Sequence, residues 1–419
     1  MNLLLRRVHE NGLLRAATLL ALAWAVGCSS SKTGGASIDA GSGADARSAK
    51  HDAGASHLKD ASDARGREVD ASDASRAHDA PGDAGVDTGP PAVRRVGRFD
   101  LGMPTMPTAE WSGSSMEARF SGTAASVQLG GSGNYFAVVV DGTVGPVLET
   151  NGGSSYPVAT GLSGGEHDVL VFRRDEAFDN PTQFLGFTFP DGGALLPPPV
   201  APAHRIELIG DSISAGYGDE CANVSTPFSS ATENEYIAYG ALTARALAAD
   251  LHVVAWSGKG MYQNVDGTQT DTMPILWQRT IPTDATSVWN PAQWIPDAVV
   301  INLGTNDYNA PGADPSTSYQ AAYLQFVTTL RGAYPEAYIF CAMGPLLGGT
   351  PLANALAAVN NVIAARHTAG DMQIGLVQFA TQMCNADGTG CGCQYHPDAT
   401  THQAMATVLE AKIRSTLGW

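Results

Sequence analysis

The feature that most constrains the fold is an alternation of short apolar runs with longer amphipathic stretches between residues 203 and 419. The apolar runs lie at 206–209, 252–256, 298–303, 337–343 and 373–379. Segments with helical spacing of apolar residues lie at 236–249, 319–330, 356–365 and 401–417. This alternation predicts an α/β domain in which a parallel sheet of five strands is covered by helices on both faces.

Polar residues and glycines follow four of these apolar runs, where the predicted strands would end. They are Asp211 and Ser212 after the first run, Gly258 and Gly260 after the second, Asn306 and Asp307 after the third, and His396 after the fifth. In open parallel sheets the functional crevice lies outside the carboxyl ends of the strands. We therefore expect these groups to share one rim.

The residue types on this rim are those that acyl transfer requires. Ser212 would be the nucleophile, and His396 would take the serine proton and return it to the leaving alcohol. Glycine N–H groups and the amide of Asn306 would stabilise the oxyanion. Taken singly, each residue also has a structural interpretation, such as a turn cap or a tight bend.

Residues 93–199 carry a different signal, because short β-type runs are separated by tight turns and no helical period is present. An Asp-Gly pair at 141–142 joins the runs 135–140 and 143–148, which indicates a hairpin. We predict an all-β sandwich, followed by a proline-rich linker that marks a domain boundary. Four aromatic side chains either line a sugar-binding face or form the sandwich core, namely Trp111, Tyr135, Phe136 and Tyr156.

The N-terminus has the features of an export signal and is left out of the predicted fold. Basic residues precede an apolar run at 16–26, and small residues then lead to Cys28 in a pattern that resembles a bacterial lipobox. We expect 1–28 to be a lipoprotein signal, with Cys28 lipidated and the exported protein anchored to a bacterial membrane at the cell surface or in the periplasm. A plain secretory signal is the alternative. Residues 29–92 are nearly all Asp, Ala, Gly, Ser and His, which predicts a disordered tether.

Charge and cysteine content narrow the partners and the compartment. The formal net charge of -17 argues against a nucleic acid partner. Cys341 lies in an apolar run and is the expected buried thiol. The remaining cysteines after Cys28 would form two disulfides, in any of three connectivities, or alternatively a zinc site; they are Cys221, Cys384, Cys391 and Cys393.

Three motifs resemble the blocks of the SGNH (GDSL-type) hydrolases: GDSIS at 210–214, GTND at 304–307 and His-Pro at 396–397. Longer stretches are similar to carbohydrate esterase family two, and they lie at 95–99, 111–113, 173–176, 232–240, 255–264 and 299–308. The resemblance covers residues 93–419. It implies a flavodoxin-like SGNH hydrolase domain at 203–419, preceded by a jelly-roll-like sandwich at 93–199.

The resemblance also assigns roles to individual positions. It implies that Ser212 is the nucleophile, His396 the base and Asn306 an oxyanion donor. The glycine donor of the family matches Gly260 best when the strand ends are aligned, and Gly258 is close enough to be the alternative.

One position departs from the pattern of the SGNH hydrolases. Most of them have an aspartate three residues before the histidine, and here that position is Cys393. We therefore predict a serine–histidine dyad in which Nδ1 of His396 donates to a main-chain carbonyl or to Gln394. Asp398 is the other nearby polar side chain, and His402 is predicted to be structural.

The implied function is removal of O-acetyl groups from polysaccharides such as xylan or glucomannan, by a monomer that needs no metal or organic cofactor. Five aromatic residues would either offer a sugar-stacking surface near the rim or belong to the core: Trp256, Trp277, Trp289, Trp294 and Tyr308. Two alternatives stay open. One is another SGNH activity, such as a lipase or thioesterase, and the other is a non-catalytic glycan-binding protein of the cell surface.

Overall fold

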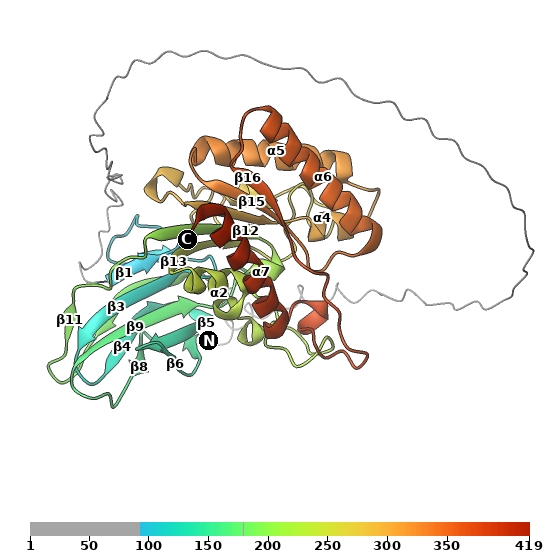
Figure 1. The fold of residues 1–419 in the computed structure, drawn as a ribbon. Helices are drawn as coiled ribbons and strands as arrows, with labels where there is room; N and C mark the ends of the chain where they lie inside the picture. Colours follow the sequence, from blue (N-terminus) through green and yellow to red (C-terminus); the bar gives the residue numbers. More distant parts are fainter. Residues whose placement is uncertain (1–92, 179) are drawn as a thin grey trace, which may run out of the picture. The chain divides into compact units, whose positions relative to one another are not determined.

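The computed structural model describes residues 93–178 and 180–419. The predicted signal peptide, the lipidation site Cys28 and the predicted tether therefore lie outside the described residues. Figure 1 shows that the described chain begins with β-strands and continues into a region where strands alternate with helices. None of the described helices has both the length and the apolar character needed to cross a bilayer.

The first region is built from antiparallel strands, as the sequence predicts. The strands are β1 (Val93–Val96), β2 (Thr108–Ala109), β3 (Ser115–Ser121), β4 (Ala125–Gly130), β5 (Ser132–Val140), β6 (Thr143–Val144), β7 (Leu148–Asn151), β8 (Ser155–Ala159), β9 (Glu166–Arg173), β10 (Thr182–Thr188) and β11 (Ala194–Leu196). One sheet has the order β1-β3-β9-β5-β6, with β11 beside β3 and β7 beside β5. The other has the order β2-β10-β4-β8.

The Asp-Gly turn and the aromatic residues of this region show how its core forms. Asp141 and Gly142 both adopt positive φ, 49° and 77°, which the predicted hairpin requires. Phe136 and Tyr156 are buried in the sandwich core, and Trp111 is buried in the core of the following region. The suggestion that these three rings line a sugar-binding face is therefore wrong, because they have no accessible face.

The second region contains the predicted parallel sheet. Its strands are β12 (His204–Gly210), β13 (Ala249–Ala255), β14 (Ala298–Asn302), β15 (Tyr338–Met343) and β16 (Ile374–Gln378), in the order β13-β12-β14-β15-β16. Every neighbouring pair is parallel. This is the flavodoxin-like order, in which the chain reverses direction across the sheet at the first strand.

Helices cover both faces of this sheet. The long ones are α2 (Tyr239–Ala246), α5 (Ser316–Ala333), α6 (Gly349–Thr368) and α7 (Ala399–Leu417), and the short ones are α1 (Ser212–Ala215), α3 (Met273–Leu276) and α4 (Thr305–Asn309). Short 3-10 turns lie at η1 (Ser230–Thr232), η2 (Glu235–Ile237), η3 (Pro291–Gln293) and η4 (Cys393–Tyr395).

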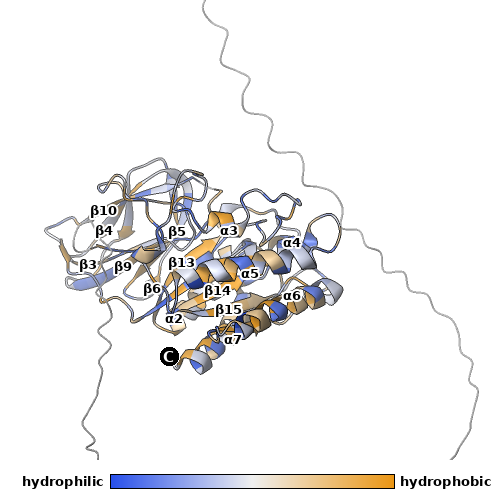
Figure 2. Cartoon of the chain, turned by 90° about the horizontal axis from the view of Figure 1, so that it is seen from above, coloured by the Kyte–Doolittle hydropathy of each residue, from blue (hydrophilic) through white to orange (hydrophobic). Residues whose placement is uncertain are grey.

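Alternate residues of each strand enter opposite cores, as a pleated strand requires. Ile209 and Ile301 pack with α5 and α6, whereas Leu208 and Val300 pack with α2 and α7. Figure 2 shows these strands as strongly hydrophobic, while the helices over them carry hydrophilic stretches. Burial on both faces explains why the strands read as continuous apolar runs rather than as alternating ones.

The helix predicted at 236–249 is shorter in the structure, where α2 ends at Ala246. Ala248 adopts a positive φ of 48°, and β13 already begins at Ala249. The alanine-rich composition favours a helix to the end, but the pairing of β13 with β12 prevails over that local propensity.

Charged residues tie the sandwich region to the parallel sheet. The guanidinium of Arg98 donates to Glu207 of β12 at 2.8 Å, and both side chains are completely buried. Arg94 of β1 forms a second ion pair with Asp250 of β13 at 2.7 Å. Separation of the two regions would leave buried charges unpaired, which is energetically costly, so these ion pairs hold the two regions together.

Candidate active site

Ser212 lies where β12 passes into the short helix α1. Asp211 caps this helix, since its Oδ1 accepts the N–H of Ile213 at 3.0 Å. A Cβ atom at Gly210 would lie only 2.0 Å from Oγ of Ser214, so the tight strand-to-helix turn requires glycine there. The turn presents the Ser212 hydroxyl beyond the carboxyl end of the sheet.

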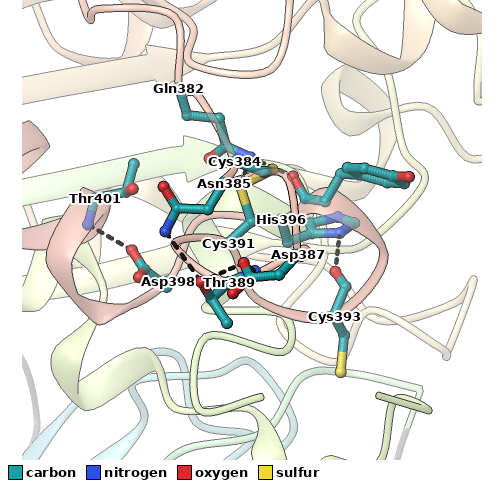
Figure 3. The surroundings of a disulfide bond; sticks show 11 residues. Gln382, Cys384, Asn385, Asp387, Thr389, Cys391, Cys393, His396, Asp398 and Thr401 are labelled. Carbon is teal, nitrogen blue, oxygen red and sulfur yellow. Dashed lines mark hydrogen bonds between the residues drawn. A yellow bond between two sulfur atoms is a disulfide. The ribbon is translucent and has the colours of Figure 1, made fainter. Parts of the chain in front are cut away.

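His396 lies beside this serine on a turn that we call the histidine turn (residues 391–396). Its Nε2 is 2.8 Å from Oγ of Ser212, and its Nδ1 is 3.1 Å from the carbonyl oxygen of Cys393 (Figure 3). A carbonyl only accepts hydrogen bonds, so Nδ1 carries the proton and Nε2 is free to accept the serine proton.

The other polar groups near His396 are engaged elsewhere. Asp398 caps α7, with its Oδ1 accepting the N–H of Thr401 at 2.8 Å (Figure 3). The side chain of Gln394 accepts the hydroxyl of Tyr217 at 3.1 Å. Of the two partners predicted for Nδ1, the main-chain carbonyl is the one that the structure provides.

His396 is partly buried, and desolvation of its ring by the surrounding protein sets its protonation. Desolvation by the surrounding protein lowers the pKa of His396 to about 4, while its hydrogen bonds to the main-chain carbonyls of Cys393 and Gln394 oppose this shift. The ring of Tyr217 contributes to this environment, with its centroid 4.4 Å from that of the imidazole. At neutral pH the imidazole is therefore uncharged and able to accept a proton.

Asn306, in helix α4, brings its side-chain amide close to the nucleophile. Its Nδ2 donates to the carbonyl oxygen of Lys259 at 2.7 Å and lies 3.2 Å from Oδ2 of Asp211. Burial raises the pKa of Asp211 to about 7. Because both amide protons have acceptors, donation from Asn306 to an oxyanion would have to replace the longer contact, the one to Asp211.

The glycines lie on a segment that we call the glycine loop (residues 257–264). The N–H of Gly260 donates to Oδ1 of Asn264 at 3.2 Å, so donation from Gly260 to an oxyanion would have to replace this contact. The assignment of the glycine donor to Gly260, with Gly258 as the alternative, stays a prediction. Gly258 adopts a positive φ of 77°, and its N–H, like that of Ser212, donates to no group in the described part of the chain.

Two carboxylates hold the glycine loop. Asp307 accepts the N–H groups of Met261 at 2.9 Å, Tyr262 at 2.7 Å and Gln263 at 3.0 Å. Burial raises the pKa of Asp307, and these three amides oppose the shift. The sequence places Asp307 on the rim and offers a turn cap as its structural interpretation. In the structure its carboxylate is the acceptor around which the loop folds.

The second carboxylate belongs to Glu176, which follows the sandwich strand β9. It accepts both the N–H and the hydroxyl of Ser257, the first residue of the glycine loop. Sequence reasoning missed this contact. The only signal is the run of four charged residues at 173–176, all of which are buried here.

The remaining predicted residues have structural positions. His402 is fully buried, and its Nδ1 accepts the N–H of Tyr239 at the start of α2, at 3.1 Å. Trp277 and Trp289 are buried core residues and offer no surface for sugar stacking. Trp256, Trp294 and Tyr308 are only partly buried. The ring of Trp294 stacks on that of His252, with the two ring centroids 3.6 Å apart.

The cysteines pair as two disulfides, Cys221–Cys393 and Cys384–Cys391, and Cys341 is the free, buried thiol that the sequence predicts. Neither Cys391 nor Cys393 keeps a thiolate for the alternative zinc site. Within the described residues, no group of three or more His, Cys, Asp or Glu side chains is arranged to hold a metal ion.

Comparisons with known proteins show the family to which the two regions are similar. The family described as carbohydrate esterase 2 N-terminal matches residues 95–199, and the GDSL-like lipase/acylhydrolase family matches residues 208–404. The chain is 39% identical over 332 residues to the cellulase/esterase CelE of Acetivibrio thermocellus, a match that covers 78% of this chain. It spans only 40% of the length of that relative.

Two further proteins are similar over most of their length. An acetylxylan esterase/glucomannan deacetylase of Cellvibrio japonicus is 29% identical over 75% of this chain and 87% of its own length. The solved structure of a family two carbohydrate esterase from Clostridium thermocellum in complex with cellohexaose is 38% identical, with a TM-score of 0.74 over 78% of this chain and 99% of that one. The chain therefore belongs to family two of the carbohydrate esterases.

Proposed function

We propose that this protein is a serine esterase that removes O-acetyl groups from polysaccharides such as xylan or glucomannan. The observation that carries the proposal is the 2.8 Å contact between Oγ of Ser212 and Nε2 of His396, with a main-chain acceptor at Nδ1. The substrate class is supported by the names of the similar proteins, which are acetylxylan esterases and glucomannan deacetylases.

The reaction proceeds in two acyl-transfer steps. Oγ of Ser212 attacks the acetyl carbonyl carbon while Nε2 of His396 takes its proton. The tetrahedral intermediate collapses, the bond to the sugar oxygen breaks, and His396 protonates the departing hydroxyl. Water then attacks the acetyl-enzyme with His396 as the base, which releases acetate and restores the serine.

The negative oxygen of each intermediate needs donors that are already in place. The N–H groups of Ser212 and Gly258 have no partner in the described chain and are the first two donors. Asn306 supplies the third when its Nδ2 turns from Asp211 to the oxyanion. Loss of one such donor typically reduces kcat by about a hundredfold to a thousandfold.

An exposed aromatic residue directly precedes the histidine in the chain. The side chain of Tyr395 is 61% exposed and directly precedes His396 in the chain. Aromatic faces bind the apolar face of a sugar ring while leaving its hydroxyl groups in water. Tyr395 would thereby hold the sugar that carries the acetyl group beside the nucleophile.

The proposal is tested by acetate release from a panel of acetylated polysaccharides, with Ser212→Ala as the control. We expect release by the native protein and none above background by the variant. Binding of acetylated xylan without any release would favour a glycan-binding protein. A strong preference for acyl chains of eight or more carbons on p-nitrophenyl esters would favour a lipase or thioesterase.

We also propose that the protein is exported and anchored through Cys28, with residues 29–92 as the tether, and that it acts as a monomer. The sequence pattern around Cys28 supports the anchor. Cys28→Ala is expected to move the protein from the membrane fraction to the soluble fraction. Light scattering on the protein after chromatography tests the monomer.

A further inference from the structure

We propose that the Cys221–Cys393 disulfide positions His396 for catalysis, at the place where most SGNH hydrolases carry an orienting aspartate. The inference rests on the proposed esterase function and concerns how the same site is held together. Cys221 lies on the segment 217–224 that follows the nucleophile helix, and Cys393 lies on the histidine turn. The two residues are 172 positions apart in sequence, and their Cα atoms are 5.3 Å apart.

The disulfide fixes the residue whose carbonyl orients the imidazole. The carbonyl oxygen of Cys393 accepts both the main-chain N–H of His396 at 3.0 Å and its Nδ1 at 3.1 Å. Cys221 and Cys393 are both buried. Any shift of Cys393 would therefore move the acceptor of Nδ1 directly and change the aim of Nε2 toward Ser212.

The backbone of the histidine turn is unfavourable without support. Gln394 and Tyr395 adopt successive positive φ values of 51° and 67°, a region that side chains with a Cβ atom rarely occupy. Such conformations persist only when the surrounding structure imposes them, and they are frequent at functional sites. A covalent link at the neighbouring residue is one such constraint.

Hydrogen bonds hold the same two segments together around the disulfide. The N–H of Cys393 donates to the carbonyl of Gly218 at 3.1 Å, and the N–H of Gln394 donates to the carbonyl of Val224 at 3.0 Å. A Cβ atom at Gly218 would lie 2.7 Å from that of Cys393, so the segments meet at a distance that only glycine permits. These bonds keep their geometry only while the two segments stay in register, which the disulfide enforces.

The second disulfide provides a matched control. Cys384 and Cys391 are separated by seven positions and close a short loop that ends at the first residue of the histidine turn (Figure 3). Neither residue donates to or accepts from Ser212 or His396 in the described structure. Loss of this bridge removes a covalent bond from the same neighbourhood without freeing the acceptor of Nδ1.

The experiment compares Cys221→Ser/Cys393→Ser with Cys384→Ser/Cys391→Ser on p-nitrophenyl acetate and on acetylated xylan. In the first variant we expect kcat to fall about a hundredfold with KM nearly unchanged, because the base loses its position. In the second we expect kcat to stay within about twofold of the native value.

Reduction of the folded native protein keeps the inference testable if the first variant fails to fold. Dithiothreitol is added in steps, opened disulfides are mapped by alkylation, and circular dichroism reports folding. We expect activity to fall with the opening of Cys221–Cys393 and to return on reoxidation.

An unchanged kcat in folded protein whose Cys221–Cys393 bridge is open would overturn the inference and leave the esterase proposal intact. Oxidised native protein that hydrolyses no ester would overturn the proposed function as well.

Discussion

Two loops flank Ser212, and different chemistry holds each of them. The histidine turn is held by main-chain carbonyls and a disulfide, and the acceptor at Nδ1 of His396 is the carbonyl of Cys393. The glycine loop is held by the buried carboxylates of Asp307 and Glu176. Together they accept the main-chain N–H groups of four loop residues: Ser257, Met261, Tyr262 and Gln263.

The difference follows from what each loop must present. A carboxylate beside an imidazole raises its pKa, whereas a neutral carbonyl orients the ring and leaves burial free to lower the pKa. The glycine loop must instead point its N–H groups at the position of the oxyanion. A carboxylate has several acceptor sites and can gather the other amides of the loop, which fixes the direction of the remaining N–H.

Removal of the base should have the largest effect. His396→Ala is expected to lower kcat by about ten-thousandfold or more, because the serine loses the group that accepts its proton. Steady-state kinetics on p-nitrophenyl acetate measures the loss. His402→Ala is the matched control, since that buried histidine contacts the main chain of Tyr239 and should affect stability instead. If His402→Ala lost activity while His396→Ala kept a near-native kcat, His402 would be the base.

Asp307→Asn tests the anchor of the glycine loop. The amide has one acceptor oxygen in place of two, so it cannot receive all three loop N–H groups, and we expect kcat to fall about a hundredfold. Asp266→Asn is the control, because Asp266 is exposed near the same loop and, among the described residues, accepts from Thr268 alone. Equal kcat values for the two variants would mean that the glycine loop keeps its shape without the carboxylate of Asp307.

Glu176→Gln tests whether the sandwich contributes to the active site. Ser257 would keep one of its two acceptors, so we expect a decrease in kcat of about tenfold with little change in KM. The exposed sandwich residue Glu149 offers the control variant Glu149→Gln. A native kcat for Glu176→Gln would mean that the loop keeps its shape without this residue.

The pH dependence of activity tests the environment of His396 on the histidine turn. Because burial lowers the pKa of His396 to about 4, kcat/KM should be half-maximal near pH 4 and flat between pH 6 and 7.5. The folded pKa lies below the unfolded value near 6.5, so the contribution of His396 to stability is complete above pH 6.5 and is lost as the pH falls toward 4. A half-maximum near pH 6.5 would indicate that an acid or solvent reaches the imidazole.

Much of this centre could be predicted because it depends on generic geometry. Parallel strands end at one edge, so residues that closely follow them, such as Ser212 after β12 and Asn306 after β14, must lie near one another. His396 comes well after the end of β16, and the histidine turn brings it back to that edge. The predicted sheet and sandwich are confirmed for the same reason, since hydrophobic period and turn residues determine them.

The missed features depend on geometry that spacing does not contain. The choice between Gly258 and Gly260 depends on loop dihedrals and on the position of Asn264. Glu176 comes from another region of the chain, and its role depends on how the sandwich meets the sheet. The disulfide connectivity required distances between cysteines, and Trp277 and Trp289 could not be placed in the core from their types alone.

The most direct test of whether a carbonyl, and not a carboxylate, orients His396 is kcat for Asp398→Asn. Asp398 is the nearest carboxylate that follows His396 in sequence. Asparagine caps a helix about as well as aspartate, so the variant removes the charge and keeps the cap of α7. We predict a kcat within about threefold of the native value, because the carbonyl of Cys393, and not the carboxylate of Asp398, accepts the Nδ1 proton of His396. A loss of more than about a hundredfold in folded protein would show that Asp398 is a true triad acid and would contradict the account.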